Sequence, residues 1–137
     1  MGAANNDILI SGDGNDTLSG LSGDDQLIGG QGDDIYIVSA GTGIDRIIDT
    51  DGSNTIQFTN DIVFSDVSSG FTKIGDDLLL KIGNLGDGVR IDNFFVLANT
   101  IDLVTFDSGG SLTAGQLYSL FGLSAPTDTV STITHVN

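Results

Sequence analysis

A nine-residue unit recurs in tandem through the first 57 residues and limits what this chain can fold into. The cleanest copy is Gly29-Gly30-Gln31-Gly32-Asp33-Asp34-Ile35-Tyr36-Ile37. The other copies keep the same phase except for a two-residue insertion, Val38-Ser39, and occupy residues 2–10, 11–19, 20–28, 40–48 and 49–57. Six tandem units predict a repetitive architecture in which each unit packs on its neighbours.

The order of residues within each unit predicts a turn followed by a short strand. The first six positions hold mainly Gly, Asp, Asn and Ser, which favour turns. The last three positions predict a strand whose central, inward-facing residue is apolar. These eighth-position residues are Leu9, Leu18, Leu27, Tyr36, Ile47 and Ile56. Two units then form one coil of about eighteen residues, with strands on two opposite faces, so that the turns of alternate units stack.

The charge balance favours a divalent cation as a partner of this chain. Nineteen acidic residues, all of them Asp, face only four basic residues, which gives a formal net charge of −15. This surplus repels nucleic acid and anionic membranes, so we expect no nucleic-acid binding and no membrane insertion. The chain has no Cys, which excludes a disulfide framework and a thiolate metal site.

A metal is also expected because the apolar ladder of the repeats is thin. Burying one Leu or Ile contributes about 1.5–3 kcal/mol, whereas ordering the backbone costs about 1–2 kcal/mol for each residue. One buried side chain in each unit cannot offset the ordering of the whole unit. We therefore expect the repeats to be disordered without metal and to fold when metal binds.

Calcium suits the oxygen atoms that the stacked turns provide. It accepts about six to eight hard oxygens, whereas magnesium demands strict octahedral geometry and retains its waters. The leading candidates are the sixth-position carboxylates Asp7, Asp16, Asp25, Asp34 and Asp45. Backbone carbonyls of the turns are expected to complete the shell, at Gly12, Gly14, Gly20, Ser22, Gly23, Gly29, Gly30, Gln31 and Gly32. Second-rank candidates, which could equally be solvated turn residues, are Asp24 and Asp33 at the fifth position and Asp13, Asp49 and Asp51 elsewhere.

The ions are expected between the turns of alternate units. Unit one pairs with unit three and unit two with unit four, and these two pairs are the most regular. The Val38-Ser39 insertion disturbs the pair of units three and five, and Asn54 in place of Asp removes a charge from the pair of units four and six. We expect about three or four calcium ions in total.

The second half of the chain has the pattern of β-strands separated by Gly, Asp and Asn turns. The expected strands cover residues 55–59, 62–67, 71–74, 78–82, 89–95 and 101–106. The segments on either side of the Gly-rich stretch 83–88 predict a hairpin. A capping box between Thr113 and Gln116 predicts one helix within residues 111–121. We expect this half to cover the outward-facing Ile35, Ile37 and Ile48 and to close the apolar end of the repeats.

The unit follows the pattern G-G-x-G-x-D-x-U-x, with U apolar, and so resembles the nonapeptide of the RTX (repeats-in-toxin) family. Residues 75–121, from Gly75-Asp76-Asp77-Leu78 to Leu112-Thr113 and beyond, resemble the domain that commonly follows RTX repeats in secreted bacterial proteins. The resemblance implies an all-β fold: a right-handed parallel β-roll, which is a calcium-filled β-solenoid, followed by a β-rich cap with one short helix. Residues 1–57 would form the roll, 58–124 the cap and 125–137 a tail.

The same resemblance implies a function for the module. It would belong to a larger secreted bacterial protein, leave the cell unfolded through the type I secretion machinery, and fold outside on binding calcium. The N-terminal residues show no Sec signal, which agrees with that route. The alternative is an extracellular adhesion or ligand-binding module, in which Phe94, Phe95 and Phe121 contact a ligand instead of packing in the cap.

The sequence does not predict an enzyme. The only His, His135, lies near the C-terminus, which leaves a nucleophilic triad without a base. Adjacent carboxylates such as Asp24 and Asp25 lie where a metal would keep them ionised, whereas glycoside hydrolysis needs a protonated acid. Pro126 follows Ala125, so the Asp-Pro bond cut by self-processing RTX modules is missing at that position.

Overall fold

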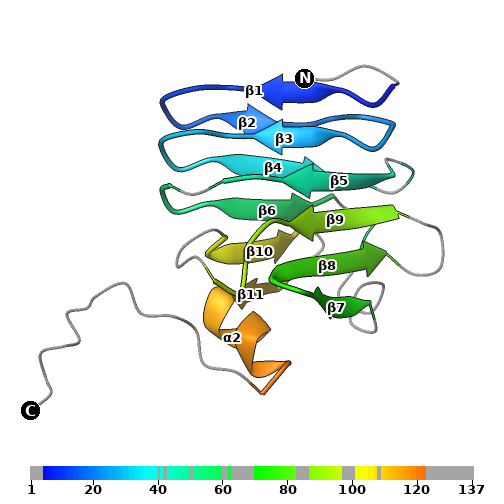
Figure 1. The fold of residues 1–137 in the computed structure, drawn as a ribbon, viewed down its shortest axis with the longest axis vertical. Helices are drawn as coiled ribbons and strands as arrows, with labels where there is room; N and C mark the ends of the chain where they lie inside the picture. Colours follow the sequence, from blue (N-terminus) through cyan, green and yellow to red (C-terminus); the bar gives the residue numbers. More distant parts are fainter. Residues whose placement is uncertain are drawn as a thin grey trace, which may run out of the picture.

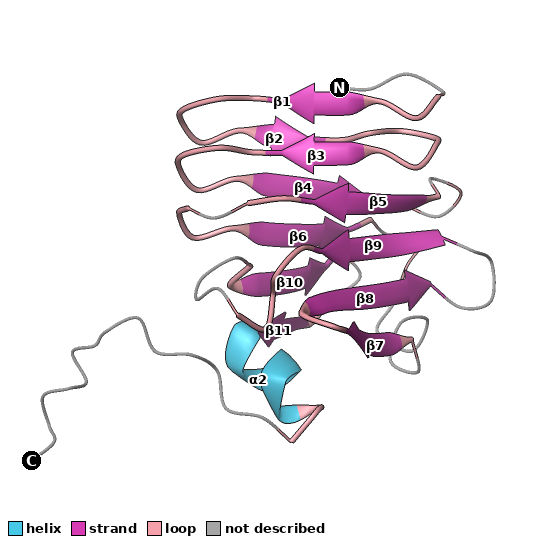
Figure 2. Ribbon diagram, in the orientation of Figure 1, coloured by secondary structure: helices cyan, strands magenta, loops and turns pink. Residues whose placement is uncertain are grey.

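In the described residues of the computed structural model, two β-sheets carry most of the regular structure and one short helix follows them (Figures 1 and 2). The structure describes residues 5–39, 41, 43–49, 51–59, 62, 70–82, 87–96, 101–107 and 109–122. The first sheet has the order β1 (Ile8–Ile10), β3 (Gln26–Ile28), β5 (Ile44–Ile47), β9 (Asp87–Ile91), β8 (Asp77–Ile82) and β7 (Phe71–Ile74). The second has the order β11 (Ser111–Thr113), β10 (Leu103–Phe106), β6 (Thr55–Phe58), β4 (Ile35–Val38) and β2 (Thr17–Leu18).

The strands of successive repeats alternate between the two sheets, as the sequence predicts. Odd-numbered repeats pair in parallel as β1, β3 and β5, and even-numbered repeats pair in parallel as β2, β4 and β6. Apolar side chains of both sheets join one core cluster. This all-β arrangement of parallel sheets fits a β-roll.

The eighth-position residues form two continuous inner rows, as expected. In the first sheet Leu9 pairs with Leu27 and Leu27 with Ile47, and in the second Leu18 pairs with Tyr36 and Tyr36 with Ile56. All of them are fully or almost fully buried except Leu9, which lies on the first strand and is half-buried. The residues before and after them face outward, because side chains alternate along a strand.

The Val38-Ser39 insertion lengthens a strand and does not shift its register. Val38 ends β4, is fully buried and pairs with Phe58 at the end of β6. The sequence separation between equivalent sixth-position residues rises from 18 for Asp7 and Asp25 to 20 for Asp25 and Asp45. The strand pairs that span the insertion, β3 with β5 and β4 with β6, keep their register although their partners are two residues further apart in the sequence.

The C-terminal half continues both sheets as further rungs. Strand β9 pairs in parallel with β5, and β10 pairs in parallel with β6, before antiparallel partners follow on each side. The inner rows therefore run on through Ile91 and Leu78 in one sheet and through Val104 and Leu112 in the other. Figure 1 shows these rungs at the end of the stack remote from the N-terminus.

Polar contacts on the outer surface join the repeats to the C-terminal half. Arg46 of β5 forms an ion pair of 2.6 Å with Asp92, which follows β9. Gln57 of β6 donates a hydrogen bond of 2.7 Å to Asp107, which follows β10. Each contact spans one pair of neighbouring rungs.

Most expected elements of the second half are confirmed: β7 has the expected bounds, and β8 and β9 begin one and two residues earlier than expected. The hairpin is formed by β8 and β9, whose connecting residues 83–86 lie outside the described part of the chain. The strand expected at 89–95 ends at Ile91, and the one expected at 101–106 begins at Leu103. Of the strand expected at 62–67 only Ile62, which is buried, is described.

The expected helix is confirmed as α2 (Ala114–Ser119), with Thr113 as its N-cap. Both hydrogen bonds of the capping box with Gln116 are present. Within the described residues, no helix is long and apolar enough to cross a membrane.

The expectation that the C-terminal half covers the outward face of the repeats is wrong for Ile35. Its side chain is 36% exposed, because the later strands extend the sheets edge to edge and do not lie across them. Ile37 and Ile48 are half-buried. The apolar end of the repeat sheets is closed as expected, since β5 and β6 both gain a further strand.

Leu27 tests the dependence of the stack on its inner rows. Replacing it with Ala leaves a cavity between Leu9 and Ile47 and should lower the free energy of unfolding by about 2–5 kcal/mol. Thermal unfolding in excess calcium measures this, with the exposed neighbour Gln26→Ala as the control. Equal stability of the two variants would contradict a core built on these rows.

Candidate metal centre

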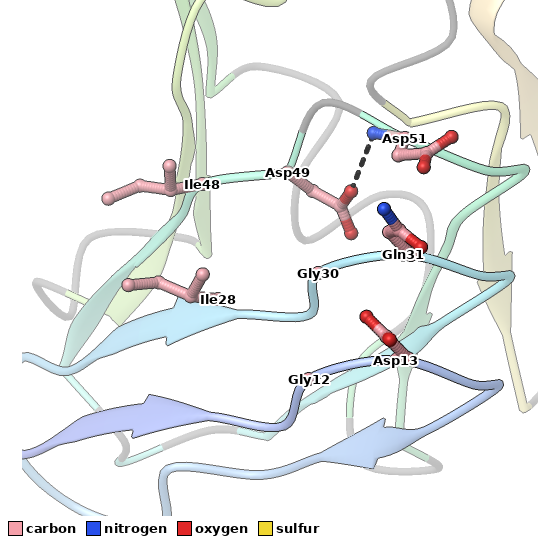
Figure 3. Close-up of a pocket in the computed structure, with 8 residues that line it drawn as sticks. All are labelled: Gly12, Asp13, Ile28, Gly30, Gln31, Ile48, Asp49 and Asp51. Carbon is pink, nitrogen blue, oxygen red and sulfur yellow. Dashed lines mark hydrogen bonds between the residues drawn. The ribbon is translucent and has the colours of Figure 1, made fainter.

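The turns of alternate repeats stack along two edges of the sheets, as the sequence predicts. One edge carries the turns that precede β1, β3 and β5, and the other carries those that precede β2, β4 and β6. Figure 3 shows the second edge, where the turns of Gly12 and Asp13, Gly30 and Gln31, and Asp49 and Asp51 lie one above another. Asp13, Gln31 and Asp51 each occupy the third position of their unit.

The sixth-position carboxylates link one coil to the next through the backbone. Asp25 Oδ1 accepts a hydrogen bond of 2.7 Å from the Asp7 amide, and Asp34 Oδ1 accepts one of 2.9 Å from the Asp16 amide. Asp45 Oδ1 accepts one of 3.1 Å from the Asp25 amide. The hydrogen bond fixes the position of one oxygen of each carboxylate. Because the carboxylate is planar, it also restricts the position of the second oxygen.

The second oxygens of three of these carboxylates have no hydrogen-bond donor among the described residues. They are Oδ2 of Asp16, Asp25 and Asp34, and each atom is buried. Asp25 and Asp34 are only 1% exposed as whole residues. A buried carboxylate oxygen without a partner costs free energy comparable to a lost charged hydrogen bond, so a cation is its natural counterpart.

Glycine at the first position makes room for these oxygens. A Cβ added to Gly20 would overlap Asp25 Oδ2, and one added to Gly29 would overlap Asp34 Oδ2. Each carboxylate therefore folds back over the start of its own turn, where only Gly leaves the space. This explains a repeat that begins with Gly and ends its turn with Asp.

Carbonyl oxygens of one turn face the next turn along the same edge. The carbonyls of Gly12, Gly14, Gly23 and Gly32 lie so close to the following coil that a side chain on its facing glycine would strike them. The Gln31 carbonyl already accepts a hydrogen bond of 2.9 Å from the Gly14 amide, and the Gly29 carbonyl accepts one from Ser11 Oγ. Ser22 is exposed.

The fifth-position residues form a second ladder, which the sequence did not reveal. Asn6, Asn15, Asp24 and Asp33 each accept a hydrogen bond from the backbone of the next coil. The amides of Ile44 and Ser53 occupy Oδ1 of Asp24 and Asp33 at 2.9 and 2.8 Å. Both carboxylates are exposed, so metal binding by Asp24 and Asp33 stays a prediction.

The sixth unit departs from the pattern in a way that sequence reasoning missed. Asn54 Oδ1 accepts from the Asp34 amide at 2.9 Å, as an Asp would, but its Nδ2 donates to the Asp51 carbonyl. Asp49 in the same turn is buried and accepts a hydrogen bond from the Tyr36 hydroxyl. The available signal was Tyr in the inner row, because a buried Tyr hydroxyl needs a polar partner.

Burial dominates the electrostatics of these turns. It raises the pKa of Asp34, with a further contribution from the nearby Asp49. It also raises the pKa of Asp49 and, together with repulsion from Asp25 and Asp24, raises the pKa of Asp45 to about 7. Desolvation and the hydrogen bond to Asp49 raise the pKa of the Tyr36 hydroxyl. Ionised carboxylates are therefore unfavourable here without a positive partner.

The donor set of the turns fits a hard cation. Among the described residues no three acidic or His side chains converge on one point, so most ligands of an ion would be backbone carbonyls. Carbonyl oxygens with one or two carboxylates suit calcium, which accepts flexible, oxygen-rich shells. The fold and these turns define a calcium-binding repeat protein.

Comparisons with known proteins identify the repeat. Residues 1–36 and 39–57 match the family model of the RTX calcium-binding nonapeptide repeat (4 copies). Residues 77–116 match that of the haemolysin-type calcium binding protein related domain. The chain therefore belongs to the proteins that carry RTX calcium-binding nonapeptide repeats. A comparison with curated proteins gave no match.

The aromatic residues considered for ligand contact pack against one another in the cap. Phe94 is 2% exposed and lies against both Phe95 and Tyr118, with ring centroids 5.1 and 5.0 Å apart. Phe95 also contacts Phe121 edge to face. His135 and Pro126 lie outside the described residues.

Asp25 provides an isosteric test of the unpartnered oxygens. Asp25→Asn retains Oδ1 for the Asp7 amide but replaces Oδ2 with a donor, as Asn54 does naturally. We expect about one calcium ion fewer, and lower stability in calcium. Isothermal titration calorimetry and thermal unfolding measure both, with the exposed Asp76→Asn in the turn between β7 and β8 as the control. Unchanged calcium binding would contradict a ligand role for Asp25.

The raised pKa of Asp45 predicts a pH dependence of calcium binding. The pKa rises on folding from 3.8 to about 7, so in the absence of metal its ionisation opposes folding increasingly as the pH rises through this window. Below a pH of about 7, calcium must displace a proton from the Asp45 carboxyl. Affinity should therefore fall from pH about 8 to about 6, with proton release on binding. Calorimetry in buffers of different ionisation enthalpy counts these protons, and Asp45→Asn should reduce their number.

Proposed function

We propose that this chain is a calcium-driven folding module. The observation that carries the proposal is the set of buried carboxylate oxygens at Asp16, Asp25 and Asp34 that have no partner among the described residues. Without a cation each of these groups opposes folding, and with one each contributes to it. The formal net charge of −15 adds general repulsion that divalent cations reduce. Calcium would therefore control whether the repeats are ordered.

The proposed ions lie between turns of alternate repeats. Asp25 and Asp45 would serve one edge together with Asp7, and Asp16 and Asp34 would serve the other. About three or four ions would occupy these positions. They would complete a closed, right-handed, calcium-filled solenoid over residues 1–57, with 58–124 as its cap and 125–137 as a tail.

The proposed biological setting follows from the family. RTX calcium-binding repeats and the haemolysin-type related domain support a place in a larger secreted bacterial protein. Type I secretion machinery would export the chain unfolded from a cytosol low in calcium. Folding outside the cell would then be coupled to the calcium found there. The proposed role is structural and not catalytic.

Circular dichroism with and without chelator tests the proposal. We expect β-structure in excess calcium and loss of most of it in excess EDTA, because the buried carboxylates then lose their counter-charge. Magnesium at the same concentration, the matched control, should not restore it. A fully folded spectrum in EDTA would sink the proposal.

A further inference from the structure

The sixth repeat carries its buried carboxylate at a different position from the others. Units three and four begin with Gly20 and Gly29 and end their turns with Asp25 and Asp34. Unit six begins with Asp49 and ends its turn with Asn54. The acid and the uncharged residue have thus exchanged ends of the turn, and Asp49 is only 3% exposed.

Hydrogen bonds hold the Asp49 carboxylate in place, with the Asn54 side chain among its partners. Oδ1 accepts one of 3.1 Å from the Asp51 amide, and Oδ2 accepts one from the Tyr36 hydroxyl. Figure 3 shows the carboxylate pointing from its own turn toward the turn of Gly30 and Gln31. Asp49 is therefore directed at the fourth unit and away from solvent.

The Asp34 carboxylate faces the same place from the fourth unit. A Cβ on Gly29 would overlap both the Tyr36 hydroxyl and Asp34 Oδ2, so these two atoms lie side by side. The single hydroxyl proton of Tyr36 goes to Asp49, which leaves none for Asp34. Asp34 Oδ2 is buried, has no donor among the described residues and feels the charge of Asp49.

No basic side chain balances this pair of carboxylates. Of the four basic residues in the chain, Arg46 pairs with Asp92 and Arg90 with Asp77. Lys73 donates to the Gly75 carbonyl, and Lys81 lies on β8 at the far end of the sheet. A hollow of about 320 Å³ lies on the Asp49 side of the pair and is lined by Asp49, Gln31 and Asp51 among others.

We infer that Asp49 is a calcium ligand, which with Asp34 holds an ion between units four and six. Asp49 replaces the carboxylate that Asn54 cannot provide, and Tyr36 is the positioning residue that orients it. This inference rests on the proposed calcium-binding function. The pair of units four and six, which was expected to lose a charge at Asn54, would then keep two carboxylates.

Terbium luminescence tests the location of this ion. Tb³⁺ replaces calcium at oxygen-rich sites and emits strongly when a nearby aromatic ring transfers energy to it. The chain has two Tyr and no Trp, and Tyr118 lies in α2, where it donates to the Phe94 carbonyl. We expect Tyr-sensitised emission from the Tb³⁺-loaded full chain, its loss in Tyr36→Phe, and its retention in the matched control Tyr118→Phe.

Asp49→Asn tests the ligand itself. The amide oxygen of Asn still accepts the Tyr36 hydroxyl, so the inner row is preserved while the charge is removed. Calorimetry should show about one calcium ion fewer, and the Tyr36-sensitised emission should fall. Asp76→Asn, an exposed Asp in the turn between β7 and β8, should leave both unchanged.

The outcomes separate this inference from the proposal it rests on. If the unaltered chain binds no calcium, the proposed function itself fails. If it binds calcium and Asp49→Asn binds the same number of ions with the same emission, the assignment of Asp49 is overturned and the proposed function stands. Should Asp49→Asn not fold, emission that survives in Tyr36→Phe would overturn the assignment by itself.

Discussion

The structure depends on a carboxylate that serves two partners at once. In units three and four Oδ1 of Asp25 and of Asp34 accepts an amide of the neighbouring coil, while Oδ2 of each is buried without a donor among the described residues. The amide bond sets the vertical register of the coils, and the free oxygen demands a cation at that register. Stacking and metal binding are therefore a single interaction, which is why a repeat with so small an apolar core can form a regular stack.

The sequence predicted the parts of the fold that follow from local periodicity. The alternation of strands between two sheets, the inner row from Leu9 to Ile56 and the capping box of α2 all follow from spacing within one unit or one turn. The insertion was placed correctly at Val38-Ser39, although its effect, a longer β4 with Val38 buried, depends on the partner Phe58 twenty residues away. That the insertion weakens calcium binding between units three and five stays a prediction.

The remaining features could not be predicted because they depend on partners distant in the chain. Nothing local in residues 87–91 or 103–106 indicates that these strands pair with β5 and β6 and continue the stack. The cover expected over Ile35 was wrong for this reason, since outward apolar residues do not specify what lies beside them. Within the candidate site, the sixth-position acids were predicted by their period. The Asp49–Tyr36 contact was not, because it joins two units through side chains that both depart from the consensus.

Where the repeats meet the cap, the backbone amides of a turn find a different hydrogen-bond partner. At the junction Asp87 of β9 accepts hydrogen bonds of 2.8 and 2.9 Å from the Gly41 and Gly43 amides, so a protein carboxylate closes the turn before β5 directly. In the same rungs the core gains large side chains, such as Phe58 stacked on Phe106 at 5.2 Å.

At the opposite end Ile8 and Ile10 are 65% and 70% exposed and Leu9 is the only inner residue of its strand. Apolar burial thus increases from the first repeat to the cap, while the unpartnered carboxylate oxygens lie in the earlier repeats. A stack with this gradient has its metal-independent stability at the C-terminal end, and ordering of the repeats is favoured to proceed from there toward the N-terminus as ions bind.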